Sequence, residues 1–365
     1  MRIKVKPNGF TLVELLVVVG IIALLVALIL PSVQRVRELA NLLTCKNHLR
    51  CMGQAVLASA SNSQGALPSG GGDQFAPNGM PMPRAFAPSG IPLSRQNQDW
   101  GWAYQILPYV ENDTLWRTQS SRMPAISASA FYDPAGDSVV SKSAIELYFC
   151  PTRRSPQNVS TSAYGERSTI DYAGNAGPWF GAVNSNVLTP GPLADVNGLT
   201  VNLSQLAGTG VIVKSRTHIS ASQTSSTINP LRLADITDGL TTTLLIAEKR
   251  VNSDRLSHQV QGTSQPGDQF GYASGFGTDT VRMAEWPPLP DYPRGVVYLI
   301  GNTPPVPSDP ISIPDGFGSS HLAGFNALFV DGSVHHIKYS IDQQLFKSVS
   351  HRYDGSAISL TNIVE

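Results

Sequence analysis

Few residues in the chain have the types and spacing that enzyme chemistry needs. An enzyme requires a nucleophile beside a base, or a pair of carboxylates in one pocket. The sequence contains no Gly-x-Ser-x-Gly segment, no phosphate-binding glycine loop and no zinc-protease helix. The remaining acids and bases are scattered, with Asp238, Glu248 and His258 as candidates. We therefore expect a protein that is not an enzyme.

One group of residues, His321 and Asp331-Gly332, could serve a ligand. With His335 or His336, these side chains could form a small metal or sugar site. The alternative is structural, because Asp-Gly is common in tight turns for backbone reasons alone. The sequence has neither the His and Cys spacings typical of zinc nor the repeated Asp loop typical of calcium. We expect the structural role and no metal or cofactor; a calcium site stays open but has no sequence support.

The composition excludes several classes of protein. The 365 residues contain 26 basic and 26 acidic side chains, so there is no basic excess for general nucleic-acid binding. Hydrophobic residues make up 41% of the chain, which argues against a mostly disordered protein. The 32 glycines and 27 prolines argue against a helix bundle, because both residues destabilise helix interiors. A turn-rich and β-rich body remains.

Residues 10–30 form an apolar run that is unlike the rest of the chain. About 20 helical residues cross a bilayer, so this run predicts one transmembrane helix. Arg2, Lys4 and Lys6 precede it, and the positive-inside bias places them in the cytoplasm and the rest of the chain outside. Glu14 lies within the run, where a carboxylate costs roughly 2.5–3.5 kcal/mol on insertion scales. A plain membrane anchor does not explain this residue.

The segment around Glu14 resembles the leader of type IV pilins and type II secretion pseudopilins. The shared features are a short basic leader, Gly9 before Phe10, Glu14 four residues later, and Pro31 after the apolar run. The resemblance implies that a prepilin peptidase removes residues 1–9 and methylates the new amine of Phe10. It also implies that Glu14 neutralises the amine of a neighbouring subunit, since opposite charges attract strongly in a low-dielectric medium.

These features predict a pilin-like membrane protein with a structural or adhesive function. The expected location is the cytoplasmic (inner) membrane, with a single pass, a cytoplasmic N-terminus and a periplasmic or cell-surface domain. The expected partners are the prepilin peptidase, other pilin-like subunits or inner-membrane components of a secretion system, and the lipid bilayer, but no nucleic acid. Two alternatives stay open: an anchored module that binds carbohydrate or another solute, and an anchored hydrolase.

The chain after the membrane segment divides at residue 61. Apolar residues recur mostly every three, four or seven positions in residues 31–61, which predicts an amphipathic continuation of the helix. Residues 62–365 contain short runs rich in Val, Ile, Thr and aromatics, bounded by turn residues. We predict an α+β, pilin-like fold, in which a long N-terminal helix packs on a large antiparallel β-rich domain. The runs include WGWAYQILPYV, AIELYFC, GVIVKS, TTTLLIAEKRV, RGVVYLIG and FNALFVDGSVHHIK, and we favour a helix for part of the first.

Residues 325–338 carry the strongest hairpin signal in the chain. Asp331-Gly332 is a favoured two-residue turn, because both of its central positions need a positive φ. The predicted register pairs Phe329 with Val334, Leu328 with His335 and Ala327 with His336. A short helix over residues 341–349 should follow, with a capping-box-like start at Ser340.

A second resemblance covers nearly the full length of the chain. Nine residues separate His321 from Asp331-Gly332, as in the H-X9-DG signature of the planctomycete DUF1559 family, whose members also begin with a prepilin leader. Further segments resemble motifs of that family: Cys45 to Leu49, Trp102 to Val110, Phe149-Cys150-Pro151, Asp171 to Asn175, and Ile236 to Glu248. The family has no established molecular function, so the resemblance implies no activity.

The three cysteines permit one disulfide. Thiols commonly pair outside the cytoplasmic membrane, and Cys45 and Cys51 lie six residues apart on one predicted helix, pointing to different sides. Either of them could reach Cys150. Because Cys45 and Cys150 lie in the family-like segments, the resemblance favours a Cys45–Cys150 disulfide. Cys51 would then be a buried, unpaired thiol.

Overall fold

The computed structural model describes residues 11–72, 82–119, 123–124, 131–132, 134–161, 165–178, 208–218, 225–253, 256, 267–268, 270–291, 316–359, 361 and 363. The predicted cleavage site at Gly9 and Phe10, the run at 294–301 and His258 lie outside these ranges. The chain divides into two compact units, Met1–Leu43 and Thr44–Glu365. The boundary between these two units lies within the helix predicted from the sequence.

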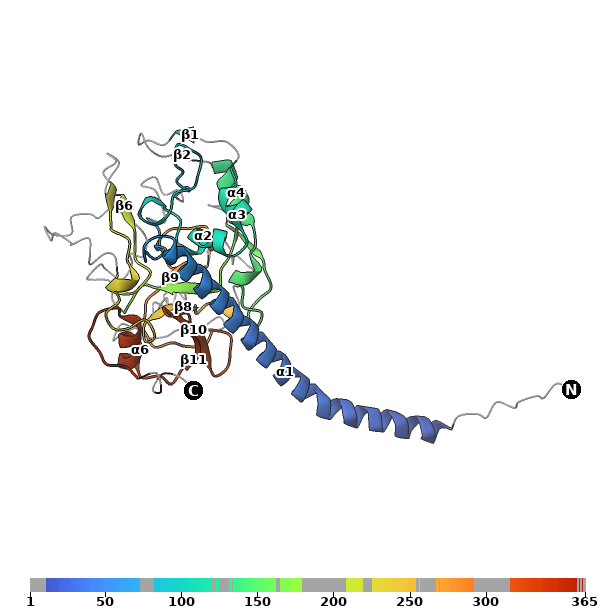
Figure 1. The fold of residues 1–365 in the computed structure, drawn as a ribbon. Helices are drawn as coiled ribbons and strands as arrows, with labels where there is room; N and C mark the ends of the chain where they lie inside the picture. Colours follow the sequence, from blue (N-terminus) through green and yellow to red (C-terminus); the bar gives the residue numbers. More distant parts are fainter. Residues whose placement is uncertain are drawn as a thin grey trace, which may run out of the picture. The chain divides into compact units, whose positions relative to one another are not determined.

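Helix α1 spans Leu12–Ser61 and continues through Pro31 (Figure 1). Its first turn is closed by Thr11 and Glu14. The Thr11 N–H and hydroxyl donate to Glu14 Oε2 at 2.9 and 2.7 Å, and the Glu14 N–H donates back to the Thr11 hydroxyl at 3.3 Å. This is a capping box, a Thr-x-x-Glu pattern that satisfies backbone donors at a helix start. The sequence contains this signal, and our sequence interpretation of Glu14 missed it.

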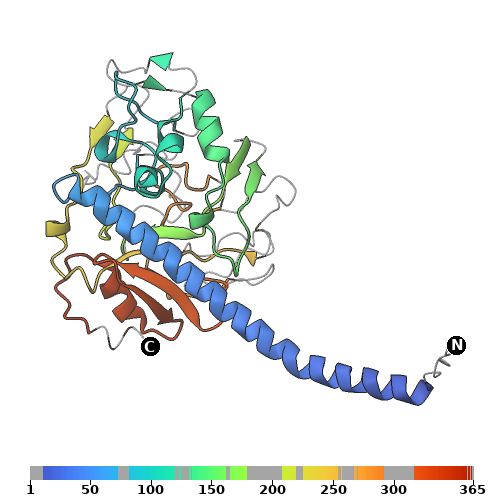
Figure 2. The same ribbon diagram turned by 45° about the vertical axis from the view of Figure 1, so that its right-hand side comes forward.

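The outer unit is built on one five-stranded sheet with the order β11-β10-β8-β5-β9 (Figure 2). Neighbouring strands are antiparallel, except that β5 and β9 are parallel. The strands are β5 (Tyr172–Asn175), β8 (Leu244–Glu248), β9 (Val281–Arg282), β10 (Gly324–Phe329) and β11 (Val334–Lys338). The α+β fold predicted from the sequence is confirmed, and the central strands β8 and β10 arise from two of the predicted apolar runs.

Both faces of this sheet are covered by helices and loops (Figure 2). One apolar cluster joins Leu49, Met52 and Val56 of α1 to Leu328 of the sheet. A second cluster joins Phe325, Ala327 and Phe329 to Phe346 and Val349 of helix α6 (Gln343–Ser350). The strands are therefore apolar on both faces, as expected for strands that lie inside a fold.

Short elements surround the sheet. They are η1 (Arg95–Asn97), α2 (Trp102–Gln105), η2 (Leu107–Tyr109), α3 (Asp113–Arg117), α4 (Pro134–Lys142), η3 (Glu146–Tyr148) and η4 (Leu233–Asp235). Three two-stranded sheets pair β1 (Met123–Pro124) with β2 (Phe131–Tyr132), β3 (Asn158–Thr161) with β4 (Gly165–Ser168), and β6 (Arg216–His218) with β7 (Ser225–Thr227). The helix favoured within WGWAYQILPYV is present. The run AIELYFC contains a 3-10 turn, and GVIVKS contains no strand, so a strand prediction for either run is wrong.

The predicted hairpin register is wrong by one residue. Val334 pairs with Leu328, and Phe329 instead closes a three-residue loop by accepting the N–H of Gly332 at 3.0 Å and donating to Ser333 at 2.9 Å. Only Gly332 in this loop has a positive φ, of 89°, whereas the predicted two-residue turn needs two such positions. Because side chains alternate along a strand, the shift moves Val334 to the opposite face.

Helix α6 begins two residues later than predicted, and its cap is Asp342 and not Ser340. The Asp342 carboxylate accepts the Leu345 N–H at 2.9 Å, which satisfies one donor of the first turn. We expect Asp342→Ala to lower the free energy of unfolding by about 1 kcal/mol, the usual value of such a cap. Thermal unfolding of the full-length chain in detergent would measure it. Ser340→Ala is the matched control, and an equal loss in both variants would contradict the assignment of the cap.

Candidate functional site

The structure does not bring His321 and Asp331 together. The six residues of β10 lie between them, a rise of about 20 Å. The Asp331 carboxylate accepts the N–H and hydroxyl of Ser333 at 2.8 and 2.6 Å, so it has the turn role. His335 contacts the Ser333 hydroxyl at 3.1 Å, and His336 contacts Asn326 at 3.1 Å. The described residues therefore give no support to a metal or sugar site that combines His321 with Asp331.

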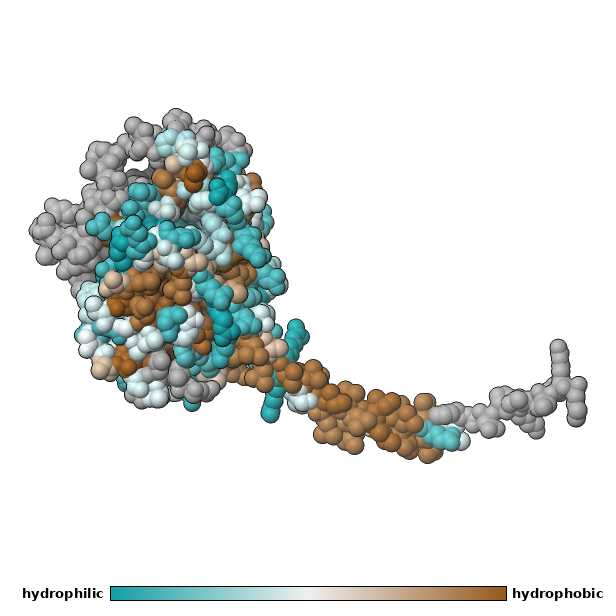
Figure 3. Space-filling view, in the orientation of Figure 1, coloured by the Kyte–Doolittle hydropathy of each residue, from teal (hydrophilic) through white to brown (hydrophobic). Residues whose placement is uncertain are grey.

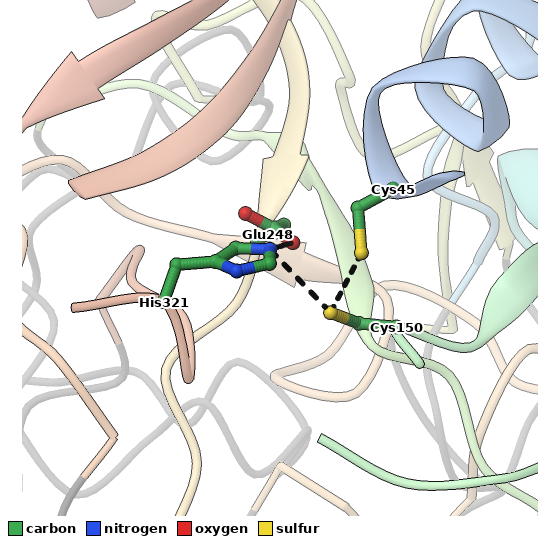
Figure 4. Close-up of side chains that lie close together, drawn as sticks. All are labelled: Cys45, Cys150, Glu248 and His321. Atoms are coloured by element: carbon green, nitrogen blue, oxygen red, sulfur yellow. Dashed lines mark hydrogen bonds and ion pairs between the residues drawn. The ribbon is translucent and has the colours of Figure 1, made fainter. Parts of the chain in front are cut away.

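His321 belongs instead to a buried group that contains Cys45, Cys150 and Glu248 (Figure 4). His321 Nε2 lies 3.2 Å from Glu248 Oε1 and 3.7 Å from Cys150 Sγ. Cys150 Sγ lies 2.8 Å from Cys45 Sγ. The four donor atoms all lie within 4.8 Å of one another, and each of the four residues is at most 1% exposed. We call these four residues the Cys-Glu-His cluster.

Four segments that are far apart in sequence position the cluster. Cys45 lies on the buried face of α1, one turn before Leu49. Cys150 follows the turn η3, and its N–H donates to the Asp171 carboxylate at 2.8 Å. Glu248 ends strand β8, and His321 precedes strand β10, which is paired with β8. The sheet therefore places the carboxylate and the imidazole side by side, and the helix brings the second sulfur.

The carboxylate of Glu248 is held by one oxygen only. Oε2 accepts the backbone N–H of Asn326 at 2.6 Å. Oε1 is buried and receives no hydrogen bond of ordinary geometry from the described residues, although it lies beside His321. Buried polar atoms without hydrogen bonds are rare because they cost free energy. The described neighbour of Oε1 is therefore the His321 imidazole, at 3.2 Å, which it meets as a charged partner.

Burial and charge set the protonation of the cluster. Burial lowers the pKa of His321, but its contacts with Cys150 and Glu248 outweigh burial and raise the pKa to about 11. Burial raises the pKa of Glu248, but His321 and the Asn326 N–H outweigh it and hold the pKa below its usual value. The Cys45 contact and burial raise the pKa of the Cys150 thiol. Without a bound ion the group is an imidazolium–carboxylate pair beside the neutral Cys150 thiol, which does not suit a thiolate nucleophile at Cys150.

A network of buried ion pairs lies next to the cluster. Asp171 accepts the Cys150 N–H and also pairs with Arg153 and Arg154, and the Arg153 guanidinium lies 3.2 Å from its Oδ1. Arg154 also pairs with Asp268 at 2.5 Å. The network alternates basic and acidic groups, and its remaining members are Lys249, which pairs with Asp268, and Asp291, which pairs with Arg153. It fixes the backbone that carries Cys150.

The cysteine predictions have mixed outcomes. Cys51 is exposed, so the prediction of a buried thiol is wrong, because residue 51 lies on the solvent side of α1. Cys45 and Cys150 are brought together, but both are free cysteines in the structure. The Cys45–Cys150 disulfide stays a prediction.

The other sequence candidates divide between structural roles and the cluster. Asp238 accepts the N–H groups of Asp354 and Gly355 at 2.6 and 2.9 Å, which fixes a turn. Glu248, one of the scattered carboxylates of the sequence, is a central member of the cluster. Sequence reasoning missed the cluster as a unit, although each member lies in or at the end of one of the family-like segments.

Known family models match both the N-terminal segment and most of the remaining chain. Residues 5–30 match the prokaryotic N-terminal methylation motif, which supports a processed, pilin-like protein. Helix α1 is also long and apolar enough to cross a membrane, which fits a membrane-anchored protein.

Residues 34–344 match the family described as protein of unknown function (DUF1559). The chain belongs to this family. The match spans α1 from residue 34 onward, the five-stranded sheet and all four members of the Cys-Glu-His cluster. No curated protein and no solved structure matches the chain.

Proposed function

We propose that the chain is a non-enzymatic pilin-like subunit that assembles with other pilin-like proteins, in a filament or a secretion system, through the exposed part of α1. In this proposal a prepilin peptidase cuts between Gly9 and Phe10. The mature chain sits in the cytoplasmic membrane, with its C-terminal unit on the periplasmic side or at the cell surface.

The observation that carries the proposal is the length of the exposed apolar surface on α1. The large apolar side chains of residues 12–30 are about half exposed or more, and Figure 3 shows this part of α1 as a largely continuous hydrophobic surface, coloured brown. A hydrocarbon core of about 30 Å takes about 20 helical residues. Apolar side chains continue beyond that length, at Val36, Leu39 and Leu43, where each is about 60% exposed or more. A second apolar helix can cover this surface, because helix faces with this spacing pack together.

Glu14 supplies the polar contact that such an assembly requires. A carboxylate in an apolar helix is expensive and needs a partner. The capping box occupies Oε2 and leaves Oε1 for the free amine of a neighbouring subunit. Residue 14 therefore has two separable roles, a hydrogen-bond role within its own helix and a charge role between subunits.

Glu14→Gln tests the charge role, because Gln at this position also forms a capping box and keeps the helix start. We expect cleavage of residues 1–9 to remain normal, and crosslinks between copies or to other pilin-like subunits in native membranes to fall at least ten-fold. Mass spectrometry of the N-terminal peptide reports cleavage, and crosslinking with mass spectrometry reports assembly. Glu38→Gln on the same helix is the matched control. Unchanged crosslinking in Glu14→Gln would show that the residue acts only as a cap and would contradict the assembly role.

A further inference from the structure

The four donor atoms of the Cys-Glu-His cluster come from distant parts of the sequence and all lie within 4.8 Å of one another. His321 Nε2 lies 3.7 Å from Cys150 Sγ and 3.2 Å from Glu248 Oε1. In a nucleophile–base–acid relay the acid contacts one imidazole nitrogen and the nucleophile contacts the other. Here both contact the same nitrogen, which excludes that relay. Side chains that share a metal ion are arranged in this way, each with its donor atom aimed at the ion.

The donor types match one class of metal ion. Two cysteine sulfurs, one imidazole nitrogen and one carboxylate oxygen are all known zinc ligands, and four such ligands form a closed tetrahedral site. Zn–S bonds of about 2.3 Å and Zn–N or Zn–O bonds of about 2.0–2.1 Å place neighbouring donor atoms roughly 3.3–3.8 Å apart. The His–Glu and His–Cys distances of 3.2 and 3.7 Å lie close to this range. The two sulfurs, at 2.8 Å, would separate by about 1 Å around an ion.

The surroundings of the cluster are those of a metal site. The Asn326 N–H holds Glu248 Oε2 and leaves Oε1 beside the His321 imidazole, at 3.2 Å. Such outer contacts orient the ligands of metal sites. Asp171 and the two arginines that bind it fix the Cys150 backbone. Arg153 is close enough to act electrostatically on both Cys150 and Glu248.

We propose that Cys45, Cys150, Glu248 and His321 form a closed, structural site for a thiophilic divalent cation, zinc, which ties the outer turns of α1 to the sheet. Binding involves no redox step: the residues bind as two thiolates, a carboxylate and a neutral imidazole, and any protons that they carry are released to solvent as the four ligand bonds form. The site replaces the Cys45–Cys150 disulfide that the sequence predicts, because a sulfur within a disulfide is not a thiolate ligand.

The test uses the full-length chain, purified in detergent without chelators or oxidants. We expect about one zinc ion per chain by plasma mass spectrometry, as in a structural site. Cobalt exchanged into the site should give the strong visible bands of tetrahedral coordination and a near-ultraviolet sulfur-to-metal charge-transfer band. Non-reducing peptide mapping of the same preparation should find no Cys45–Cys150 linkage. A metal-free chain that contains this disulfide would overturn the proposal, and so would a metal-free chain with free thiols that fails to take up cobalt.

Variants identify the ligands. Cys45→Ser should lower the charge-transfer intensity of the cobalt form by about half, because one of two thiolates is lost. Glu248→Gln should lower zinc affinity at least ten-fold. Cys51→Ser lies on the same helix, removes an exposed thiol and is the matched control, so metal content and spectrum should not change. Circular dichroism checks folding. If a folded Cys45→Ser chain keeps the wild-type cobalt spectrum, the assignment is wrong, and if a variant does not fold, the wild-type metal content and peptide map decide.

Discussion

Asp268→Asn is expected to lower the free energy of unfolding of the outer unit by about 3–5 kcal/mol, the usual cost of leaving a buried charge without its partner. Asp268 is 3% exposed and lies 2.5 Å from Arg154 and 3.2 Å from Lys249. Asparagine has nearly the same shape, so the variant removes charge without creating a cavity. Chemical unfolding of the full-length chain in detergent, followed by tryptophan fluorescence, measures the loss.

The control for this prediction is Asp113→Asn. Asp113 pairs with Arg117 at 2.7 Å on the surface of α3, where both side chains are half exposed or more. Exposed pairs of this kind contribute about 0–1 kcal/mol. Equal losses in the two variants would mean that the buried network does not behave as an ionic unit.

The same network predicts how acid acts on the protein. Burial raises the pKa of Asp268, but Arg154 and Lys249 outweigh burial and hold the pKa well below its usual value. A carboxylate with a lowered pKa in the folded state stabilises the fold above its unfolded pKa of about 3.9, and this contribution is lost as the pH falls below that value. The dependence of stability on pH below about 4 should therefore be shallower in Asp268→Asn.

Gly271→Ala should be as damaging as the loss of a buried charge, for a purely steric reason. Gly271 has a φ of 59°, and a Cβ at this position would lie 1.7 Å from the backbone oxygen of Ser168. Because the oxygen belongs to backbone, no side-chain rotation relieves the contact. Strain and overpacking together should cost about 4 kcal/mol or more, which is large for a single substitution.

Gly165→Ala separates backbone strain from the steric contact. Gly165 has a φ of 72°, but nothing lies within 4 Å of a Cβ at this position. Its cost should be about 1–2 kcal/mol, the value of a left-handed conformation alone. Thermal unfolding of both full-length variants gives the comparison. Similar melting temperatures would show that the backbone near Gly271 moves aside without difficulty.

Local patterns were sufficient to predict some elements of the fold and insufficient for others. Leu244–Glu248 and the two strands of the C-terminal hairpin have strong apolar, β-branched and aromatic patterns, and they form strands. The hairpin register was wrong because Asp-Gly is compatible with both a two-residue and a three-residue loop. The choice between the two loops decides whether Val334 pairs with Phe329 or with Leu328. Tertiary packing decides it, because Val334 and Leu328 pack in the same apolar cluster.

The Cys-Glu-His cluster could not be predicted as a site, for a related reason. Short spacings identify ligands only when neighbouring ligands lie on one element. Here Cys45, Cys150, Glu248 and His321 come from four elements, and only the pairing of β8 with β10 and the packing of α1 bring them together. Cys51 was predicted to be buried and is exposed, because the helical period alone does not identify which face of the helix the domain covers.

The packing of Gly53 against Leu328 has a consequence for the order in which the protein folds. A Cβ at Gly53 would lie 2.7 Å from the Leu328 side chain, so helix and strand meet there closely. Gly53 and Leu328 are 275 positions apart in the sequence, and at typical synthesis rates of about 5–20 residues per second the helix emerges roughly 14–55 s before its strand. During that interval the apolar stripe of Leu49, Met52 and Val56 has no sheet to pack on. Because α1 is synthesised before the sheet, this apolar stripe depends on the membrane or a chaperone for shielding until the last third of the chain, which carries β8, β10 and β11, has been made.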